Sequence, residues 1–529
     1  MKEKIYKIIL INIIFVVSIF AKSLVPENFT LALNDSLPDS IAYAGIGSNG
    51  VSDIQVSGDS TLLFATGAGL SITYDAGESF YTYYNSLGSV AYGGVSAIAT
   101  LGEKIWIATA YDTVISSSNL PVGNGISYSE DDGHSWTHFP QMVDHADSNF
   151  VIYFGDTIPA LPITVPVQNV TYDLAVNVNS NGDTILWATS WAGGTRRSDD
   201  FGASWKRVVL PPDDLDTLNE TTSHDFDLSP SSGALGYEEN FNHMGFSVIA
   251  VEDTIAVGTA GGINISYDCG ITWIKYTAQN SDVSGNFVRA LYRSDNGVIY
   301  GASLPANDPN EYYSLVYTDE NSGELEWNST LRNVNIYNIN SGNDFVFVGS
   351  EDGLYISGDG WSWVKNGAIM DDGGVRIYSE KIYSVAIDED NYLWIGSDDG
   401  LAKSPDNGVT WEIIRRVQSL PNLNKLDMSV YPNPFSPARM NIWNDDGYVR
   451  IHCNFPNDGN ATIEVFDFGM KRVKKVLTDK NVTKGEIDFV WTCKNEMNDI
   501  VANGVYFIKV TFNSGDKKEV DWTKLIILD

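Results

Sequence analysis

Cysteine is scarce in this chain: 3 of the 529 residues are cysteine, namely Cys269, Cys453 and Cys493. So few cysteines exclude the dense disulfide framework that holds many secreted domains together. Their positions also lack the paired spacing of a structural zinc site. Cys453 and Cys493 fall in the same C-terminal stretch, where they can form one disulfide or remain free buried thiols. The sequence leaves both alternatives open.

Basic residues are also few. The chain holds 33 Lys and Arg against 68 Asp and Glu, a net charge of −35. The deficit lies in residues 22–424, which carry 52 acidic and 16 basic residues. A surface this acidic repels nucleic acid and anionic membranes, so we expect no nucleic-acid partner. It suits either a divalent cation such as calcium or acidic loops that keep the chain soluble in salt, and no cofactor is certain.

Long apolar runs are missing, apart from one at the start of the chain. Residues 8–20 are apolar, with Lys2, Lys4 and Lys7 before them and the small Ala21 after them. Charge, length and exit residue are those of a signal peptide, and the run is short for a membrane-spanning helix. We predict a signal peptide at residues 1–21, with an uncleaved anchor as the alternative. The mature chain is then exported and not an integral membrane protein.

What the chain does contain is a repeated β pattern, best preserved at residues 392–413. An apolar strand ends in a small-residue step, a glycine turn leads to another strand, and a hairpin follows. The step recurs at spacings of 43, 80, 70, 44, 47 and 47 residues, and the two long spacings hold insertions. Such a period with four strands predicts propeller blades, which bury one another's faces. We therefore expect an all-β seven-bladed β-propeller over residues 22–424. The steps are at Ala65, Ala108, Ala188, Gly258, Ala302, Gly349 and Gly396.

The hairpin of the repeat carries the motif Ser/Thr-x-Asp-x-Gly-x-Ser/Thr-Trp. Its aspartates are Asp75, Asp131, Asp200, Asp268, Asp359 and Asp406, with a shortened copy at Asp359. A carboxylate in this place can accept backbone N–H groups across the turn, and the glycine permits a left-handed conformation. We interpret these aspartates as structural, because a group needed in every blade is rarely the one reactive group.

These hairpins resemble the Asp-box of bacterial sialidase-like and sortilin-like propellers. The resemblance implies a propeller fold, and it extends to the hairpins and the period alone. Sialidases need an arginine triad, whereas residues 22–195 contain no arginine, which argues against that active site. A xyloglucanase-like pair of carboxylates across a cleft stays open as an alternative.

Two insertions, residues 140–169 and 209–245, link the second to the third blade and the third to the fourth. If strands alternate in direction, these links lie on the face opposite the Asp-box hairpins. Long loops on a rigid scaffold commonly bind ligands. The candidate ligand-binding residues near blades two to four are Trp191, Tyr237, His145, His224 and His243. His224, Asp225 and Asp227 are candidate metal ligands, with ordinary solvated loop residues as the alternative.

Residues 425–529 form a different, nearly neutral segment. Its short apolar strands predict a β-sandwich. Its recurrent elements resemble the C-terminal sorting domain of type IX secretion cargo and, equally, the immunoglobulin-like domain of the FlgD-like family. The resemblance implies an Ig-like fold and the type IX secretion machinery as a partner, although Trp491-Thr492-Cys493 departs from the usual Trp-Asp-Gly. The matching residues are Tyr431, Pro432, Asn433, Pro434, Phe435, Gly504, Tyr506 and Lys524.

Together these features predict a secreted or cell-surface propeller that binds a glycan or a protein, with the C-terminal domain as its sorting signal. A secreted glycoside hydrolase is the alternative, and its catalytic residues cannot be named from the sequence. A cation-dependent adhesive protein is a third reading.

Overall fold

The computed structural model describes residues 45–57, 61–83, 90–115, 118–232, 238–306, 308–321, 324–372, 375–416, 425–443 and 446–529. The predicted signal peptide lies outside these ranges. The chain divides into two compact units, one of residues 1–371 and 380–415 and one of residues 372–379 and 416–529. The division lies close to the expected boundary at residue 425. The short segment 372–379, however, belongs to the second unit, which the sequence pattern did not indicate.

The main sheets of the first unit are antiparallel, and their strands follow one another in chain order, apart from one edge strand added to sheet 4. Sheet 1 contains β1 (Val51–Ser57), β2 (Thr61–Thr66), β3 (Gly69–Thr73) and β4 (Tyr81–Tyr83). Sheet 2 contains β5 (Gly94–Leu101), β6 (Lys104–Ile115), β7 (Ser118–Ser129) and β8 (Thr137–Phe139). Sheet 3 contains β11 (Thr171–Val178), β12 (Thr184–Ser190), β13 (Gly194–Ser198) and β14 (Lys206–Arg207). Sheet 4 contains β18 (Gly245–Val251), β19 (Thr254–Thr259), β20 (Gly262–Ser266) and β21 (Trp273–Tyr276).

Sheet 5 is β22 (Phe287–Arg293), β23 (Ile299–Leu304), β24 (Ser314–Asn321), β25 (Glu324–Thr330), and sheet 6 is β26 (Ile336–Gly342), β27 (Phe345–Ser350), β28 (Gly353–Ser357), β29 (Val364–Lys365). Sheet 7 is β30 (Ile382–Ile387), β31 (Leu393–Ser397), β32 (Leu401–Ser404) and β33 (Glu412–Ile414). Among the described residues, no helix has the length and hydropathy that a transmembrane helix needs.

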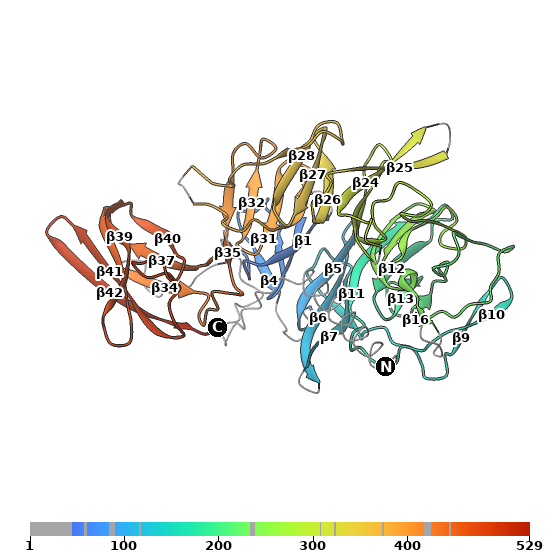
Figure 1. Cartoon of the computed structure of the whole chain (residues 1–529). Helices are drawn as coiled ribbons and strands as arrows, with labels where there is room; N and C mark the ends of the chain where they lie inside the picture. Colours follow the sequence, from blue (N-terminus) through green and yellow to red (C-terminus); the bar gives the residue numbers. More distant parts are fainter. Residues whose placement is uncertain are drawn as a thin grey trace. The chain divides into compact units, whose positions relative to one another are not determined.

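The first strands of the sheets contact one another in a closed cycle. They follow the order β1, β5, β11, β18, β22, β26, β30, and β30 returns to β1. Figure 1 shows β1 beside β31, although the two lie at opposite ends of this unit in the sequence. The closure is strengthened by two backbone hydrogen bonds, from Ile46 N to Arg415 O and from Gly400 N to Asn49 O. The first unit is therefore an all-β propeller, as predicted.

The turns between the third and fourth strands, called the aspartate turns below, share one hydrogen-bond pattern. Asp131 Oδ1 accepts from Ser135 N at 2.8 Å, and its Oδ2 accepts from Ser135 Oγ at 2.6 Å. The preceding Ser129 Oγ donates to the same carboxylate at 2.9 Å and accepts from Gly133 N at 2.9 Å. The same bonds recur at Asp75, Asp200, Asp268 and Asp406, and a shortened form at Asp359.

The two insertions do not stay on the face opposite the aspartate turns, so that expectation is wrong. The first insertion contains a hairpin of β9 (Phe150–Tyr153) and β10 (Asp156–Pro159). Tyr153 Oη donates to Ile271 O, in the aspartate turn of sheet 4, at 2.7 Å. The second insertion adds β15 (Thr217–Leu218) to the outer edge of sheet 4, next to β21. Apolar side chains explain this course.

Those apolar side chains lie in one cluster, where the insertions cover the outer ends of sheets 3 and 4 and bury two tryptophans. Its members from the insertions and the tryptophans are Tyr153, Ile158, Leu218, Leu228, Trp187 and Trp273. The second insertion also contains β16 (Ser231–Ser232), β17 (Glu238–Glu239) and the 3-10 helix η1 (Phe241–His243). Burial of the apolar residues offsets the cost of ordering such long loops.

The second unit has two main sheets around its own core. One is β34 (Asp427–Tyr431), β37 (Val449–Phe455) and β40 (Gly485–Trp491), and the other is β39 (Arg472–Val482), β38 (Gly459–Phe466), β41 (Gly504–Ser514) and β42 (Lys517–Ile527). A two-residue pair, β35 (Ile442–Trp443) and β36 (Asp446–Gly447), lies beside them. Alternate residues of these strands point into one apolar core. Cys453 and Cys493 are buried there as free thiols.

Candidate ligand-binding channel

Every first strand of the propeller has a β-bulge near its start. The register of each first strand slips by one residue against the second strand, which leaves one extra residue there. A bulge turns its extra side chain away from the regular pleat. The extra residues all line one cavity on the propeller axis: Ser52, Ser96, Tyr172, Phe246, Arg289, Tyr337 and Tyr383.

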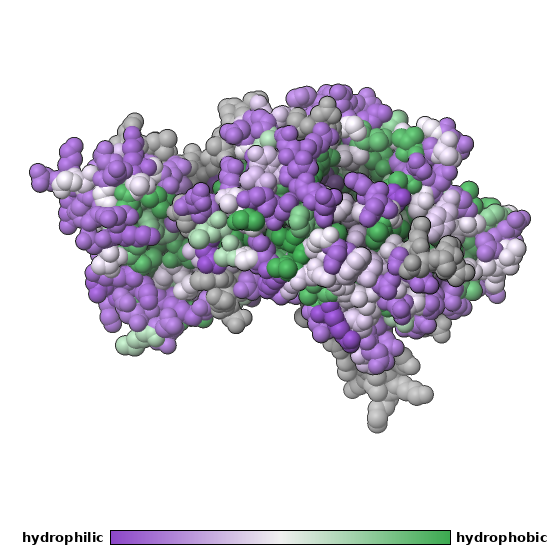
Figure 2. Space-filling view, turned by 90° about the horizontal axis from the view of Figure 1, so that it is seen from above, coloured by the Kyte–Doolittle hydropathy of each residue, from purple (hydrophilic) through white to green (hydrophobic). Residues whose placement is uncertain are grey.

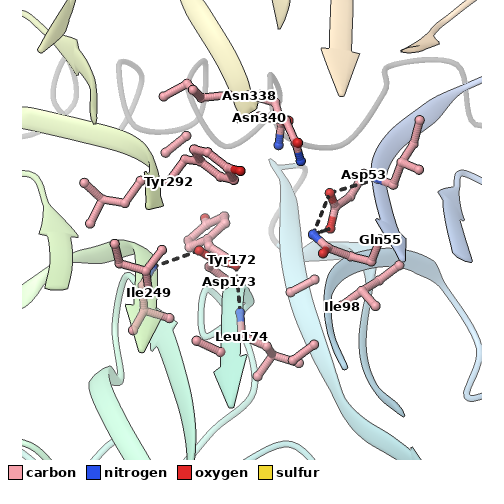
Figure 3. A pocket seen from close by; sticks show the side chains of 18 of the residues that line it. Asp53, Gln55, Ile98, Tyr172, Asp173, Leu174, Ile249, Tyr292, Asn338 and Asn340 are labelled. Carbon is pink, nitrogen blue, oxygen red and sulfur yellow. Dashed lines mark hydrogen bonds between the residues drawn. The ribbon is translucent and has the colours of Figure 1, made fainter. Parts of the chain in front are cut away.

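This cavity, called the channel below, has a volume of about 360 Å³ and is lined by the first strands β1, β5, β11, β18, β22, β26 and β30. Its size falls within the range of small-molecule sites in proteins. Figure 3 shows polar side chains pointing into it from several sheets, among them Gln55, Asn338, Asn340 and Tyr292. The bulges lie at the starts of the first strands. Their extra residues therefore mark the end of the channel that faces the blade links.

Two carboxyl groups, Asp53 and Asp173, occupy the channel. Burial raises the pKa of Asp53 to about 6 and that of Asp173 to about 8, and the charge of Asp53 contributes to the second shift. Asp53 binds the Gln55 side chain and the Ile54 amide. Asp173 accepts from Leu174 N at 2.9 Å and from Val248 N, in the next sheet, at 2.8 Å. Asp173 thus holds neighbouring sheets together, and its burial favours the protonated form of the carboxyl group.

Two arginines, Arg289 and Arg293, line the channel, and Arg289 is buried, with 3% of its surface exposed. Its Nη1 donates to Asn335 Oδ1 at 3.0 Å and to Ile336 O at 3.3 Å. Asn335 Nδ2 in turn donates to Glu351 Oε2 at 2.8 Å. No carboxylate in the described ranges forms an ion pair with Arg289. A buried guanidinium without a direct counter-ion is costly, so this end of the channel favours an anionic or strongly polar ligand group.

Aromatic rings surround Arg289 and its neighbours at the same end. The guanidinium lies 4.9 Å from the ring centroid of Tyr337, which packs on Tyr383 at 5.1 Å. On the other side, Phe246 packs on Tyr172 at 5.2 Å and on Phe287 at 4.4 Å. Rings packed in tilted pairs make a rigid rim with hydroxyl groups. The channel mouth can therefore hold a ligand with both an apolar face and a polar group.

The residues predicted to bind a ligand do not come together. The side chain of His145 is 80% exposed, in the first insertion. His243 is buried in η1 beside Ala192 O at 3.1 Å, and burial lowers the pKa of His243 to about 4. Trp191 packs against the apolar cluster that contains Phe246, which lines the channel. Tyr237 lies outside the described residues.

The predicted metal ligands do not converge either. His224 Nδ1 is 2.7 Å from Asp156 Oδ2, and its Nε2 is 3.0 Å from Asn219 O, so both ring nitrogens have protein partners. Neither Asp225 nor Asp227 takes part in these contacts. Within the ranges that the structure describes, no three His, Cys, Asp or Glu side chains are grouped as a metal site would need.

A buried ion cluster instead fixes the first insertion to sheet 3. Asp144 receives Arg196 through two nitrogens, at 2.8 and 3.0 Å, and Arg207 at 2.6 Å. The three side chains are 4–9% exposed. Burial alone would raise the pKa of Asp144, but the two arginines outweigh it and lower that pKa. The pattern could not be found in the sequence, since Arg196 lies 52 residues after Asp144 and Arg207 lies further along the chain.

No family model and no curated protein matches the chain. Among solved structures, the chain is similar to PorZ, a surface component of the type IX secretion system of Porphyromonas gingivalis, at 12% identity, 91% of this chain, 75% of that chain and a TM-score of 0.27. It is also similar to YCF48 bound to D1 peptide (14%, 69% and 96%, TM-score 0.38) and to an ancestral GH74 enzyme (13%, 91% and 63%, TM-score 0.49). These scores are low, and the fold rests on the strand order and contacts of this chain.

Proposed function

We propose that this chain is an exported, seven-bladed Asp-box propeller that binds a glycan or a protein at the cell surface or outside the cell. Residues 425–529 are, on this proposal, an Ig-like sorting domain for type IX secretion. The signal peptide at residues 1–21 directs the first step of export. On this proposal the strongly acidic first unit binds the glycan or protein, and the second unit is the sorting signal.

The observation that carries the proposal is the way two distant sequence motifs meet in the second unit. Phe435 N donates to Ile526 O at 2.8 Å, and Leu528 N donates to Phe435 O at 2.9 Å. Phe435 is buried in the core of this unit, with 1% exposed. The Tyr431–Phe435 segment therefore lies against the closing strand β42. On this proposal the secretion machinery recognises the two together.

The binding half of the proposal is supported by the channel mouth. Its buried Arg289, aromatic rim and volume of about 360 Å³ suit one end of a ligand. Hydrophilic residues cover much of the face seen in Figure 2. Such a surface keeps the protein soluble in salt, and it leaves the few apolar recesses as the specific binding places.

A secreted glycoside hydrolase is the second candidate, and the two carboxyl groups of the channel favour it. Asp53 and Asp173 have pKa values of about 6 and about 8, and a separation of pKa values is typical of acid and base pairs. Against this, both carboxyl oxygens of Asp173 already accept hydrogen bonds from backbone amides. Hydrolysis of a polysaccharide panel that is lost in Asp53→Asn would favour the enzyme.

The export half is tested in a bacterium with type IX machinery and in an otherwise identical strain without its outer-membrane translocon. The full chain is expressed in both strains, and intact cells are treated with protease. We expect the protein to be accessible to the protease only in the strain that has the machinery. The same location in both strains would contradict the proposal.

A further inference from the structure

A second cavity lies away from the propeller axis, beside sheet 5. It has a volume of about 500 Å³ and is called the outer cleft below. Its walls are the link between sheets 4 and 5 (residues 278–284), the turn between β23 and β24 (residues 308–312), and Asn328 with Ser329 of β25. Links and second-to-third turns lie at the same end of the sheets, so the outer cleft opens on the face of the channel mouth.

The walls of the outer cleft are fixed to one another before any ligand arrives. Tyr312 N donates to Ser284 O at 3.0 Å, and Ser284 Oγ is 2.6 Å from Ser314 Oγ. Glu311 Oε2 accepts from Ala306 N at 2.6 Å and from Asn286 N at 3.3 Å. A preformed site loses little conformational entropy on binding.

Tyr312 gives the outer cleft an aromatic surface. The guanidinium of Arg332 lies 4.0 Å from its ring centroid. Arg332 does not line the cleft whereas Tyr312 does, so the arginine supports the ring from the side away from the cavity. The hydroxyl is held 3.2 Å from Ser329 Oγ. The Tyr312 ring is thus packed against the Arg332 guanidinium and fixed at its hydroxyl group, and its remaining surface is available to a flat apolar ligand face.

Several polar groups in the outer cleft have hydrogen-bonding capacity to spare. Within the described ranges, the Asp282 carboxylate and the Asn328 amide make no hydrogen bond, and Gln279 uses its carbonyl oxygen on Asn286 but not its amide nitrogen. Together they offer both acceptors and donors on short side chains. Sugar hydroxyls each donate and accept, so a row of them needs such a mixture.

The charge of the outer cleft selects among sugars. Asp282, Asp308 and Glu311 line it, and no lysine or arginine of the described part of the chain does. With three carboxylates among its lining residues, the outer cleft repels an anionic ligand. A purely apolar ligand would leave the polar groups without partners. The remaining chemistry is an uncharged molecule with many hydroxyls and one apolar face, which describes a neutral sugar ring.

We propose that the outer cleft binds a neutral oligosaccharide, with Tyr312 stacked against one sugar ring and Asp282, Gln279 and Asn328 bound to its hydroxyls. This inference rests on the ligand-binding role proposed above and names its ligand class and its place. A divalent cation held by the carboxylates is the competing occupant, although no group of three metal-ligating side chains exists among the described residues.

The test uses the full mature chain and four probes: cellohexaose, xylohexaose, mannohexaose and N-acetylchitohexaose. Binding is measured by calorimetry, with an oligogalacturonate as the anionic comparison. We expect at least one neutral probe to bind, and the oligogalacturonate to bind more weakly. Tyr312→Ala and Asp282→Ala should each weaken that binding about tenfold or more. The control Tyr267→Ala removes an aromatic side chain that is 54% exposed next to the aspartate turn of sheet 4 and should change nothing.

Asp282→Ala removes an exposed carboxylate without a hydrogen-bond partner in the described ranges, so it keeps the test valid if Tyr312→Ala lowers stability. A neutral probe that binds both variants as tightly as the original chain overturns the outer-cleft assignment and leaves the proposed function standing. Binding of none of the four probes overturns the assignment as well. So does calcium binding that is lost in Asp282→Ala, because the cleft is then a cation site. Export is measured separately and is independent of these outcomes.

Discussion

The side chain of Asn433 forms hydrogen bonds with the backbone of the closing strand at Lys524 and Ile526. Asn433 Nδ2 donates to Lys524 O at 2.7 Å, while Asn433 Oδ1 accepts from Ile526 N at 2.9 Å. Asn433 and Lys524 lie 91 positions apart in the chain. One amide therefore joins the Tyr431–Phe435 segment to β42, and it does so with both of its hydrogen-bonding groups.

Asn433→Ala is expected to destabilise the second unit by about 1–2 kcal/mol, because two hydrogen bonds to strand backbone are lost. The measurement is urea unfolding of the full chain, followed by the fluorescence of a tryptophan in the second unit. Asn513→Ala, an exposed position on β41 without a side-chain hydrogen bond in the described ranges, is the control. An equal effect of both substitutions would contradict the joining role of Asn433.

Asp144→Asn should destabilise the propeller strongly, by about 3–5 kcal/mol, because two buried arginines lose their only carboxylate partner in the described ranges. Thermal unfolding measures the effect. Asp147→Asn, whose side chain is 92% exposed in the same insertion, should leave the midpoint unchanged. A small effect of Asp144→Asn would mean that the first insertion is held to sheet 3 by its apolar contacts alone.

The channel makes stability depend on pH through Asp173. Its folded pKa, raised by burial to about 8, lies above the ordinary aspartate value of about 4. The folded state therefore keeps a proton that the unfolded state releases. The stabilisation is fully present below about pH 4 and is lost as the pH rises through about 8.

Asp173→Asn removes this titration, so its urea midpoint should fall less than that of the original chain between about pH 5 and about pH 9. Unfolding curves at several pH values check this. Asp147→Asn should keep the full dependence on pH. Parallel curves for Asp173→Asn and the original chain would show that Asp173 is ionised in the folded channel.

Asp406→Ala tests whether the aspartate turns are structural. The substitution removes acceptors for Thr410 N and Oγ1 and for Ser404 Oγ. The bonds to Thr410 are exposed and the bond to Ser404 is part-buried, so we expect a loss of about 1 kcal/mol in unfolding free energy. Binding of a glycan probe by the same variant should be unchanged. Lost binding in a variant with normal stability would assign this aspartate a role in ligand recognition.

The repeat was readable in the sequence because a hairpin is a local structure. Asp131, Ser129 and Ser135 lie within seven residues, and their hydrogen bonds need nothing from the rest of the chain. The apolar steps mark the second strands for the same reason. Strand identity and order could therefore be predicted, and so could the propeller that stacks them.

The channel could have been found but was missed. Apolar residues in the first strands stand three apart, as in Val51 and Ile54 or Ile382 and Val385, where a regular strand requires an even spacing. That odd spacing is the signature of a bulge, and the residue after the first apolar position lines the channel. A strict period of two does not predict such a bulge, so it does not predict the channel.

The position of the insertions and of their histidines could not be predicted, because it depends on contacts between distant segments. His224 meets Asp156 across 68 residues, and His243 meets Ala192 across 51. No local pattern specifies such pairs. Apolar residues of the insertions fill the outer ends of sheets 3 and 4, and that packing draws both loops toward the aspartate turns.

The central claim is that the second unit is read by a secretion machine, and Lys524 gives the most direct test. Its side chain is exposed on β42, as is that of Lys518 on the same face of the strand. The surface fraction of Lys524→Ala and Lys518→Ala, as full chains in a type IX-competent bacterium, should be compared with that of the original. We predict a clear loss for Lys524→Ala alone, with unchanged melting of both variants. An unchanged surface fraction for Lys524→Ala would contradict the account.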